Sequence, residues 1–108
     1  MSTYNSLTAS IDGLLSSVKL EWTSTMAGTD ADGADAVMAS QTIYYTDVYE
    51  ANDGSGPVNE NKSIDVGTDI SATITGLTSD RAYQFTIRGS DNATTPVTFH
   101  RSVNATPN

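Results

Sequence analysis

The chain has 108 residues, a formal net charge of −8 and no cysteine. This length fits one domain and leaves no room for two ordinary ones. The lack of cysteine excludes disulfides, thiolate metal sites and cysteine nucleophiles, and the five lysines and arginines are scattered along the chain. A phosphate backbone requires clustered cations, so we expect neither nucleic acid nor an anionic membrane as a partner.

Apolar and polar residues alternate in several short segments, a period typical of strands with one buried face. Val18, Leu20 and Trp22, for example, alternate with Lys19 and Glu21. The pattern predicts seven strands, at about residues 7–11, 17–23, 42–51, 62–66, 70–75, 82–88 and 96–103. Turn residues such as those at 53–57 separate them. Strands this short and this evenly spaced predict a seven-stranded antiparallel β-sandwich, with residues 1–108 as one domain and its core within about 7–103.

Residues 24–41 form a long connection rich in alanine, aspartate and glycine. Its second half, 34–40, could form one helical turn, although a helix that short is not stable alone. A connection this long is usually functional or mobile. We therefore expect it to become ordered only when a partner binds.

Three segments resemble the fibronectin type III family along nearly the whole chain. Val18–Trp22 resembles its second strand with the core tryptophan, and Thr46–Tyr49 stands where the family has an aromatic-rich third strand. Ile74–Leu77, followed by Tyr83–Arg88, is similar to the junction between its E and F strands. The resemblance implies that the leucine closes the core and that the tyrosine forms a tyrosine corner, whose hydroxyl bonds to nearby backbone.

The chain departs from the family pattern in two places. Where the family usually has proline, glycine and threonine before the corner tyrosine, this chain has Ser79, Asp80 and Arg81. The connection at 24–41 is also longer than is usual in the family. We therefore expect the corner turn and one end of the sandwich to differ in detail.

The sequence shows no pattern of residues that is typical of a catalytic site. His100 is the only histidine, and no serine lies in a pattern that marks an activated nucleophile. The acidic run at 30–35 is similar to a calcium loop, but the EF-hand register fails, because Ala34, Asp35 and Gln41 stand where a ligand, glycine and glutamate are needed. The sequence predicts neither enzyme nor cofactor nor metal site, and a solvated acidic loop is the simpler interpretation.

The candidate binding residues all lie in the long connection: Met26, Asp30, Asp32, Asp35, Val37 and Met38. Methionine suits adaptable contact surfaces, but the apolar members could equally fold back over the open end of the sandwich. An Arg-Gly-Asp adhesion motif is absent, because Ser90 separates Gly89 from Asp91.

Function is inferred from context, because a fold of this kind hosts many functions. No signal peptide is visible in the first residues, and domains of the resembled family occur in bacteriophage virions. The first hypothesis is a non-enzymatic virion surface protein that binds a capsid or tail protein lattice, where it could also contact its own copies. The alternatives are an extracellular spacer or carbohydrate-associated module of a secreted bacterial multidomain enzyme, and a cell-surface adhesion module.

Overall fold

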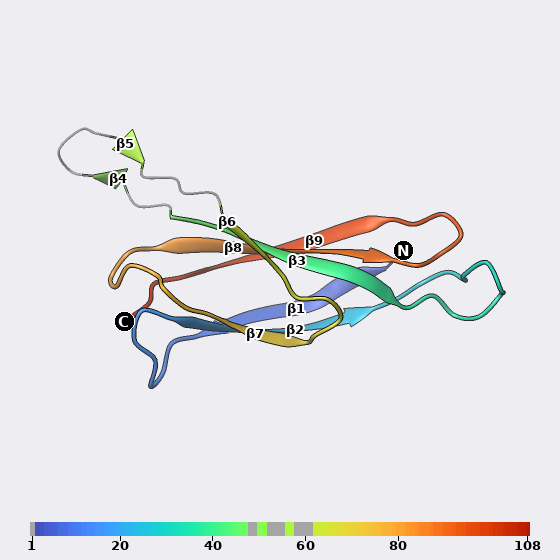
Figure 1. Ribbon diagram of the computed structural model, residues 1–108, viewed down its shortest axis with the longest axis horizontal. Coiled ribbons are helices and arrows are strands. Elements are labelled where there is room, and N and C mark those ends of the chain that lie inside the picture. Colours follow the sequence, from blue (N-terminus) through green and yellow to red (C-terminus); the bar gives the residue numbers. More distant parts are fainter. Residues whose placement is uncertain (1, 48–49, 52–55, 58–61) are drawn as a thin grey trace.

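The computed structural model describes residues 2–47, 50–51, 56–57 and 62–108. Within these residues, seven strands form two antiparallel sheets that face each other (Figure 1). The first sheet contains β1 (Thr3–Ser10), β2 (Val18–Thr25) and β7 (Ser71–Ile74), in the order β1-β2-β7. The second contains, in spatial order, β6 (Lys62–Asp65), β3 (Met38–Asp47), β8 (Tyr83–Asp91) and β9 (Thr98–Ala105). The short strands β4 (Glu50–Ala51) and β5 (Gly56–Pro57) pair with each other.

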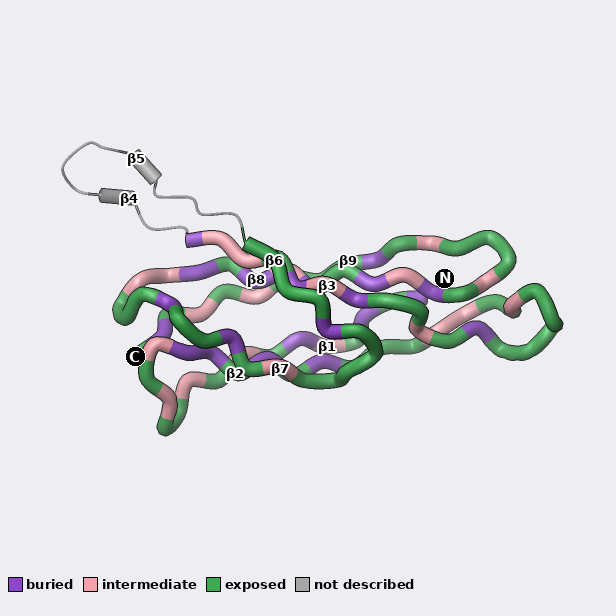
Figure 2. The backbone as a smooth tube through the Cα atoms, in the orientation of Figure 1, coloured by how far each residue is buried: buried purple, intermediate pink, exposed green. Residues whose placement is uncertain are grey.

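The core lies between the two sheets and is built from the inward-facing residues, which alternate with outward-facing ones along each strand. Figure 2 shows buried positions alternating with exposed ones along these strands. Val18, Leu20 and Trp22 of β2 form one core cluster with Ile43 of β3 and inward residues of β8. The three residues of β2 are each at most 3% exposed. Across the described ranges the structure contains no helix, and hence none long and apolar enough to cross a membrane.

Gln41 of β3 joins the two sheets through a buried hydrogen-bond network. Its Oε1 accepts hydrogen bonds from Trp22 Nε1 at 3.0 Å and from the Tyr4 hydroxyl at 2.9 Å, both on the opposite sheet. Its Nε2 donates to the carbonyl oxygens of Gly67 at 3.2 Å and Asp69 at 2.8 Å. Burial raises the pKa of the Tyr4 hydroxyl well above its ordinary value, so this phenol remains a donor. Gln41 therefore has both amide hydrogens and its carbonyl oxygen paired.

Gly89 of β8 makes room for the aromatic ring that reaches across from β1. A Cβ at this position would overlap the Tyr4 hydroxyl and press against the Met38 sulfur at 3.1 Å. The ring of Tyr4 also packs on Phe99, with centroids 4.9 Å apart. A glycine is required here by close approach of a neighbouring side chain, which gives Gly89 a packing role.

The tyrosine corner that the resemblance implies is present in the structure. Tyr83 is buried at the start of β8, and its hydroxyl accepts a hydrogen bond from the backbone N–H of Thr78 at 2.9 Å. Leu77, also buried, closes this end of the core. Asp80 adopts a φ of 65°, the left-handed conformation in which glycine is most comfortable and aspartate is tolerated. The departure from the family sequence therefore leaves the corner intact.

Several predicted strand bounds are wrong. The first strand begins at Thr3, the third begins at Met38 in place of 42, and the last spans Thr98–Ala105 in place of 96–103. Residues 48–49 of the predicted third strand lie outside the described residues. Register shifts lie between Tyr4 and Ser6 in β1 and between Met38 and Ser40 in β3. A bulge places an extra residue in one strand, so it interrupts the alternation of apolar and polar residues near the beginning of each of these strands. Residues 53–55 of the predicted turn lie outside the described residues.

Candidate functional site

Two connections at one end of the sandwich form a single surface, which we call the loop end. It consists of residues 26–37 between β2 and β3 and residues 92–97 between β8 and β9 (Figure 1, right). The backbone N–H of Asn92 donates to the Val37 carbonyl at 3.0 Å, and the Asn92 side-chain oxygen accepts from the Val37 N–H at 2.8 Å. The Thr94 N–H donates to the Thr29 carbonyl at 3.0 Å. These bonds hold the two loops together as one unit.

The longer loop of this surface is also bonded to itself. The Asp30 N–H donates to the Ala34 carbonyl at 2.9 Å, and the Ala36 N–H donates to the Gly28 carbonyl at 3.0 Å. Asp30 Oδ1 accepts from the N–H groups of Asp32 at 2.9 Å and Ala34 at 3.0 Å, the local pairing that favours aspartate in turns.

Two expectations about this connection are corrected by these contacts. The helical turn predicted at 34–40 is wrong, because residues 34–36 bond across the loop and Met38–Ser40 belong to β3. The connection itself is shorter than the predicted 24–41, because its two ends extend the flanking strands. Within the chain alone the loop is held by these hydrogen bonds, and the expectation that it becomes ordered only when a partner binds stays a prediction.

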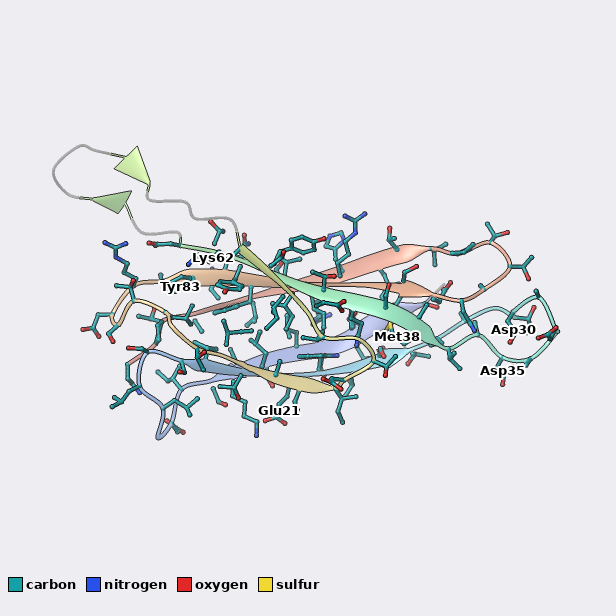
Figure 3. The ribbon with its side chains drawn as sticks, in the orientation of Figure 1. Glu21, Asp30, Asp35, Met38, Lys62 and Tyr83 are labelled. Atoms are coloured by element: carbon teal, nitrogen blue, oxygen red, sulfur yellow. The ribbon has the colours of Figure 1, made fainter. Side chains whose placement is uncertain are left out.

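The predicted apolar contact residues divide into two groups. Met26 and Met38 are partly buried and pack against the core at the base of the loop end, where Figure 3 places Met38. Val37 lies beside them in the chain, but its side chain is 55% exposed. Val37 is therefore the apolar residue of this set that a partner could contact without displacing the core.

The predicted acidic residues lie around the outer part of the loop. Asp32 and Asp35 are exposed and Asp30 is half-buried, and Figure 3 shows Asp30 and Asp35 at the far end of the molecule. Among the described residues, no three carboxylates or histidines are grouped so that they could hold a metal ion. These carboxylates give the loop end a negative surface.

Asp91 is a buried carboxylate at the base of the loop end that the sequence analysis treated only as part of an interrupted adhesion motif. It is 2% exposed and accepts a hydrogen bond from the Ser2 hydroxyl at 2.7 Å. The N–H groups of Ala93 and Val97 also donate to it, at 3.2 and 3.3 Å. The Ser2 hydrogen bond, with smaller contributions from these backbone donors, lowers the pKa of Asp91 below its ordinary value.

The shift at Asp91 predicts a loss of stability in acid. Its pKa is lower in the folded chain than the ordinary value of 3.8, so the unfolded chain binds more protons there. The stabilisation is present above the ordinary pKa and is lost as the pH falls through the folded pKa. We expect urea unfolding to show a smaller loss of stability between pH 7 and about pH 3 for Asp91→Asn than for the parent chain. Identical pH profiles would contradict this assignment.

Two further side chains are of types that often act in catalysis, a histidine and a second buried carboxylate. His100 is exposed on β9 opposite Arg88 of β8, and no hydrogen bond or ion pair joins its imidazole to another described residue. Asp47, a second buried carboxylate, pairs with Arg81 at 2.9 Å. In the part of the chain that the structure describes, no serine or threonine is held against a histidine base, the contact an activated nucleophile needs.

A second surface, which the sequence analysis missed, is the outer face of the sheet β6-β3-β8-β9. Tyr44 stands near its centre and is 45% exposed. Two hollows flank it, one of about 400 Å³ bordered by Thr46 and Gln84, and one of about 180 Å³ bordered by Thr42 and Arg88. An aromatic residue at an outward position between Thr42 and Thr46 was the available signal in the sequence.

The two sheets and their strand order define an all-β sandwich of the fibronectin type III fold. The structure is similar to the crystal structure of the FN5 domain of Drosophila Lar, with a TM-score of 0.53 and 19% sequence identity. The similarity covers 98% of this chain and 96% of that one. No family model and no curated protein matches the sequence. At this identity the similarity establishes the fold alone, and a fold of this kind does not by itself define a function.

Proposed function

We propose that the chain is a non-enzymatic module on the surface of a bacteriophage virion, attached by its loop end to the capsid or tail protein lattice. The observation that carries this proposal is the bonding of the two loops to each other, through Asn92 with Val37 and Thr94 with Thr29. Loops that are bonded to each other lose less conformational freedom on binding than loops without such bonds. Exposed Val37, with Asp32 and Asp35 nearby in the loop, supplies an apolar contact beside negative charge.

The buried acids support a binding role over a catalytic one. Asp91 is held by Ser2 and two backbone N–H groups, and Asp47 by Arg81. Each of these carboxylates stabilises the sandwich and is turned away from solvent. What the chain can present to another molecule is therefore its loops and the outer faces of its sheets.

The test begins with the protein in its native source. Particles are separated on a density gradient, and each fraction is examined for this chain by mass spectrometry. We expect the chain to band with a symmetric particle at a fixed ratio to its main lattice protein. Finding it only in particle-free fractions, or only within a longer polypeptide that carries a hydrolase, would overturn the virion assignment.

The attachment surface is tested by adding purified chain back to particles that have been stripped of it. We expect Val37→Glu to lower occupancy at a given concentration by about tenfold, since a charge would then enter the contact. Leu15→Glu is the matched control, because Leu15 is 81% exposed in the β1–β2 connection at the opposite end. Equal occupancy by Val37→Glu and the parent chain would remove the loop end from the proposal.

A further inference from the structure

Among the described residues, the outer face of the sheet β6-β3-β8-β9 is a largely polar surface with Tyr44 near its centre. Tyr44 lies directly opposite Ser63 on one side and Thr86 on the other. The neighbouring outward rows pair Thr42 with Arg88 and Thr46 with Gln84. We call this set, with Tyr44 at its centre, the Tyr44 face.

Much of the hydrogen-bonding capacity of the Tyr44 face is unused by the protein itself. No hydrogen bond, ion pair or ring contact joins the side chains of Tyr44, Gln84, Arg88 or Thr42 to any described residue. The hydroxyl of Thr46, on the border of the larger hollow, is buried and lacks a hydrogen-bond partner within the described part of the chain. A buried hydroxyl without a partner is uncommon in native proteins and calls for an explanation.

We propose that the Tyr44 face binds a neutral oligosaccharide. A pyranose ring presents C–H groups on one face and hydroxyl groups around its edge. The negative face of an aromatic ring attracts such C–H groups, and the half-exposed ring of Tyr44 offers this contact at the centre of the surface. The surrounding amide, hydroxyl and guanidinium groups match the sugar hydroxyls as donors and acceptors.

The shape of the surface fits a chain of sugars more closely than a single one. The hollow of about 400 Å³ lies on the Thr46 side of Tyr44, and that of about 180 Å³ lies on the Thr42 side. Both therefore follow the direction of β3, and the outward positions from Ser40 to Thr46 extend over roughly 20 Å. One sugar would stack on Tyr44, and its neighbours would occupy the hollows beside Gln84 and Arg88.

The charge of the chain and the polarity of the Tyr44 face favour a neutral oligosaccharide over an acidic polysaccharide or a protein partner. The net charge of −8 opposes the approach of a polyanion such as an acidic polysaccharide. A stable protein interface usually has a more apolar centre, with charged residues depleted. The Tyr44 face instead places Arg88, Gln84 and three threonines around one aromatic ring.

The oligosaccharide site goes beyond the proposed virion function and does not depend on it. The Tyr44 face covers the side of one sheet, whereas the loop end lies at one end of the sandwich. A chain attached through the loop end would leave this face open. If the chain does not band with particles, the oligosaccharide site is not contradicted. If the chain does not bind oligosaccharides, its attachment to a particle through the loop end is not contradicted.

The test titrates the ¹⁵N-labelled chain with the neutral oligosaccharides cellohexaose, laminarihexaose, xylohexaose, mannohexaose and chitohexaose, and with acidic hexagalacturonate, while amide chemical shifts are followed. We expect at least one neutral hexasaccharide to shift the amides of Thr42, Tyr44, Gln84 and Thr86 in a saturable way at millimolar concentration. The amides of residues 26–37 should not move. No saturable shift with any neutral probe, shifts confined to other surfaces, or binding of hexagalacturonate alone would overturn the proposal.

Matched variants identify the stacking contact. We expect Tyr44→Ala to weaken binding of the responding hexasaccharide by about tenfold or more and Tyr44→Phe to retain most of it. Gln84→Ala provides a second variant with a milder loss. Ile70→Ala is the control, because Ile70 is 74% exposed beside the other sheet, near Glu21 and Ser71. If Tyr44→Ala keeps a native amide spectrum and binds as tightly as the parent chain, the proposal is wrong.

Discussion

Replacing Trp22 by alanine is expected to destabilise the chain by about 3 to 5 kcal/mol. Trp22 is 3% exposed and packs between the sheets among Leu20, Ile43 and Phe85. Its loss leaves a cavity that a strand held on both sides cannot close. Domains of this size have a total stability of about 5 to 15 kcal/mol, so the variant should unfold at a much lower denaturant concentration.

This prediction is measured by guanidinium unfolding followed by far-ultraviolet circular dichroism, because Trp22 is the only tryptophan. Tyr44→Ala is the control, since its ring lies on the outer face and its loss should change stability by no more than about 0.5 kcal/mol. A loss below about 1 kcal/mol for Trp22→Ala would mean that the indole is not part of the core.

Replacing Gln41 by leucine is expected to cost about 3 to 5 kcal/mol, although leucine is apolar and similar in size. The change leaves the buried Trp22 Nε1–H and the Tyr4 hydroxyl without their shared acceptor. It also removes the donor to the carbonyls of Gly67 and Asp69. The fluorescence of Trp22 reports the unfolding of this variant directly.

A double-variant comparison separates the unpaired donors from simple misfit of the new side chain. In the parent chain, Tyr4→Phe removes a hydrogen bond to Gln41 and should destabilise by about 1 kcal/mol. In the Gln41→Leu background, the same change removes an unpaired buried hydroxyl and should be neutral or stabilising. If Tyr4→Phe costs the same in both backgrounds, the network does not account for the effect of Gln41.

The sandwich could be predicted because burial of one strand face is visible in local alternation. Val18, Leu20 and Trp22, and likewise Tyr83, Phe85 and Ile87, have the period of a half-buried strand, and the structure buries all six. The tyrosine corner was implied by the resemblance of Ile74–Leu77 and Tyr83–Arg88 to the fibronectin type III family. Strand ends were less accurate, because the shifts of register near Tyr4 and Met38 break the alternation.

The polar groups that hold the sandwich together could not be found in this way. Gln41 was assigned to the end of a loop, and Asp91 to an interrupted motif after a strand. Their structural partners, Trp22 and Ser2, lie 19 and 89 residues away in the sequence. A buried glutamine or aspartate looks the same in the sequence as an exposed one until its partners are known.

The sequence by itself determined the class of fold, because alternating apolar residues lose contact with water only when two sheets close over them. It also located the long connection and its acidic residues. Only the tertiary structure decided which surfaces are presented to other molecules. Tyr44, Gln84 and Arg88 lie on one outer face because β3 and β8 pair in one register, and a shift of one residue would turn Tyr44 into the core.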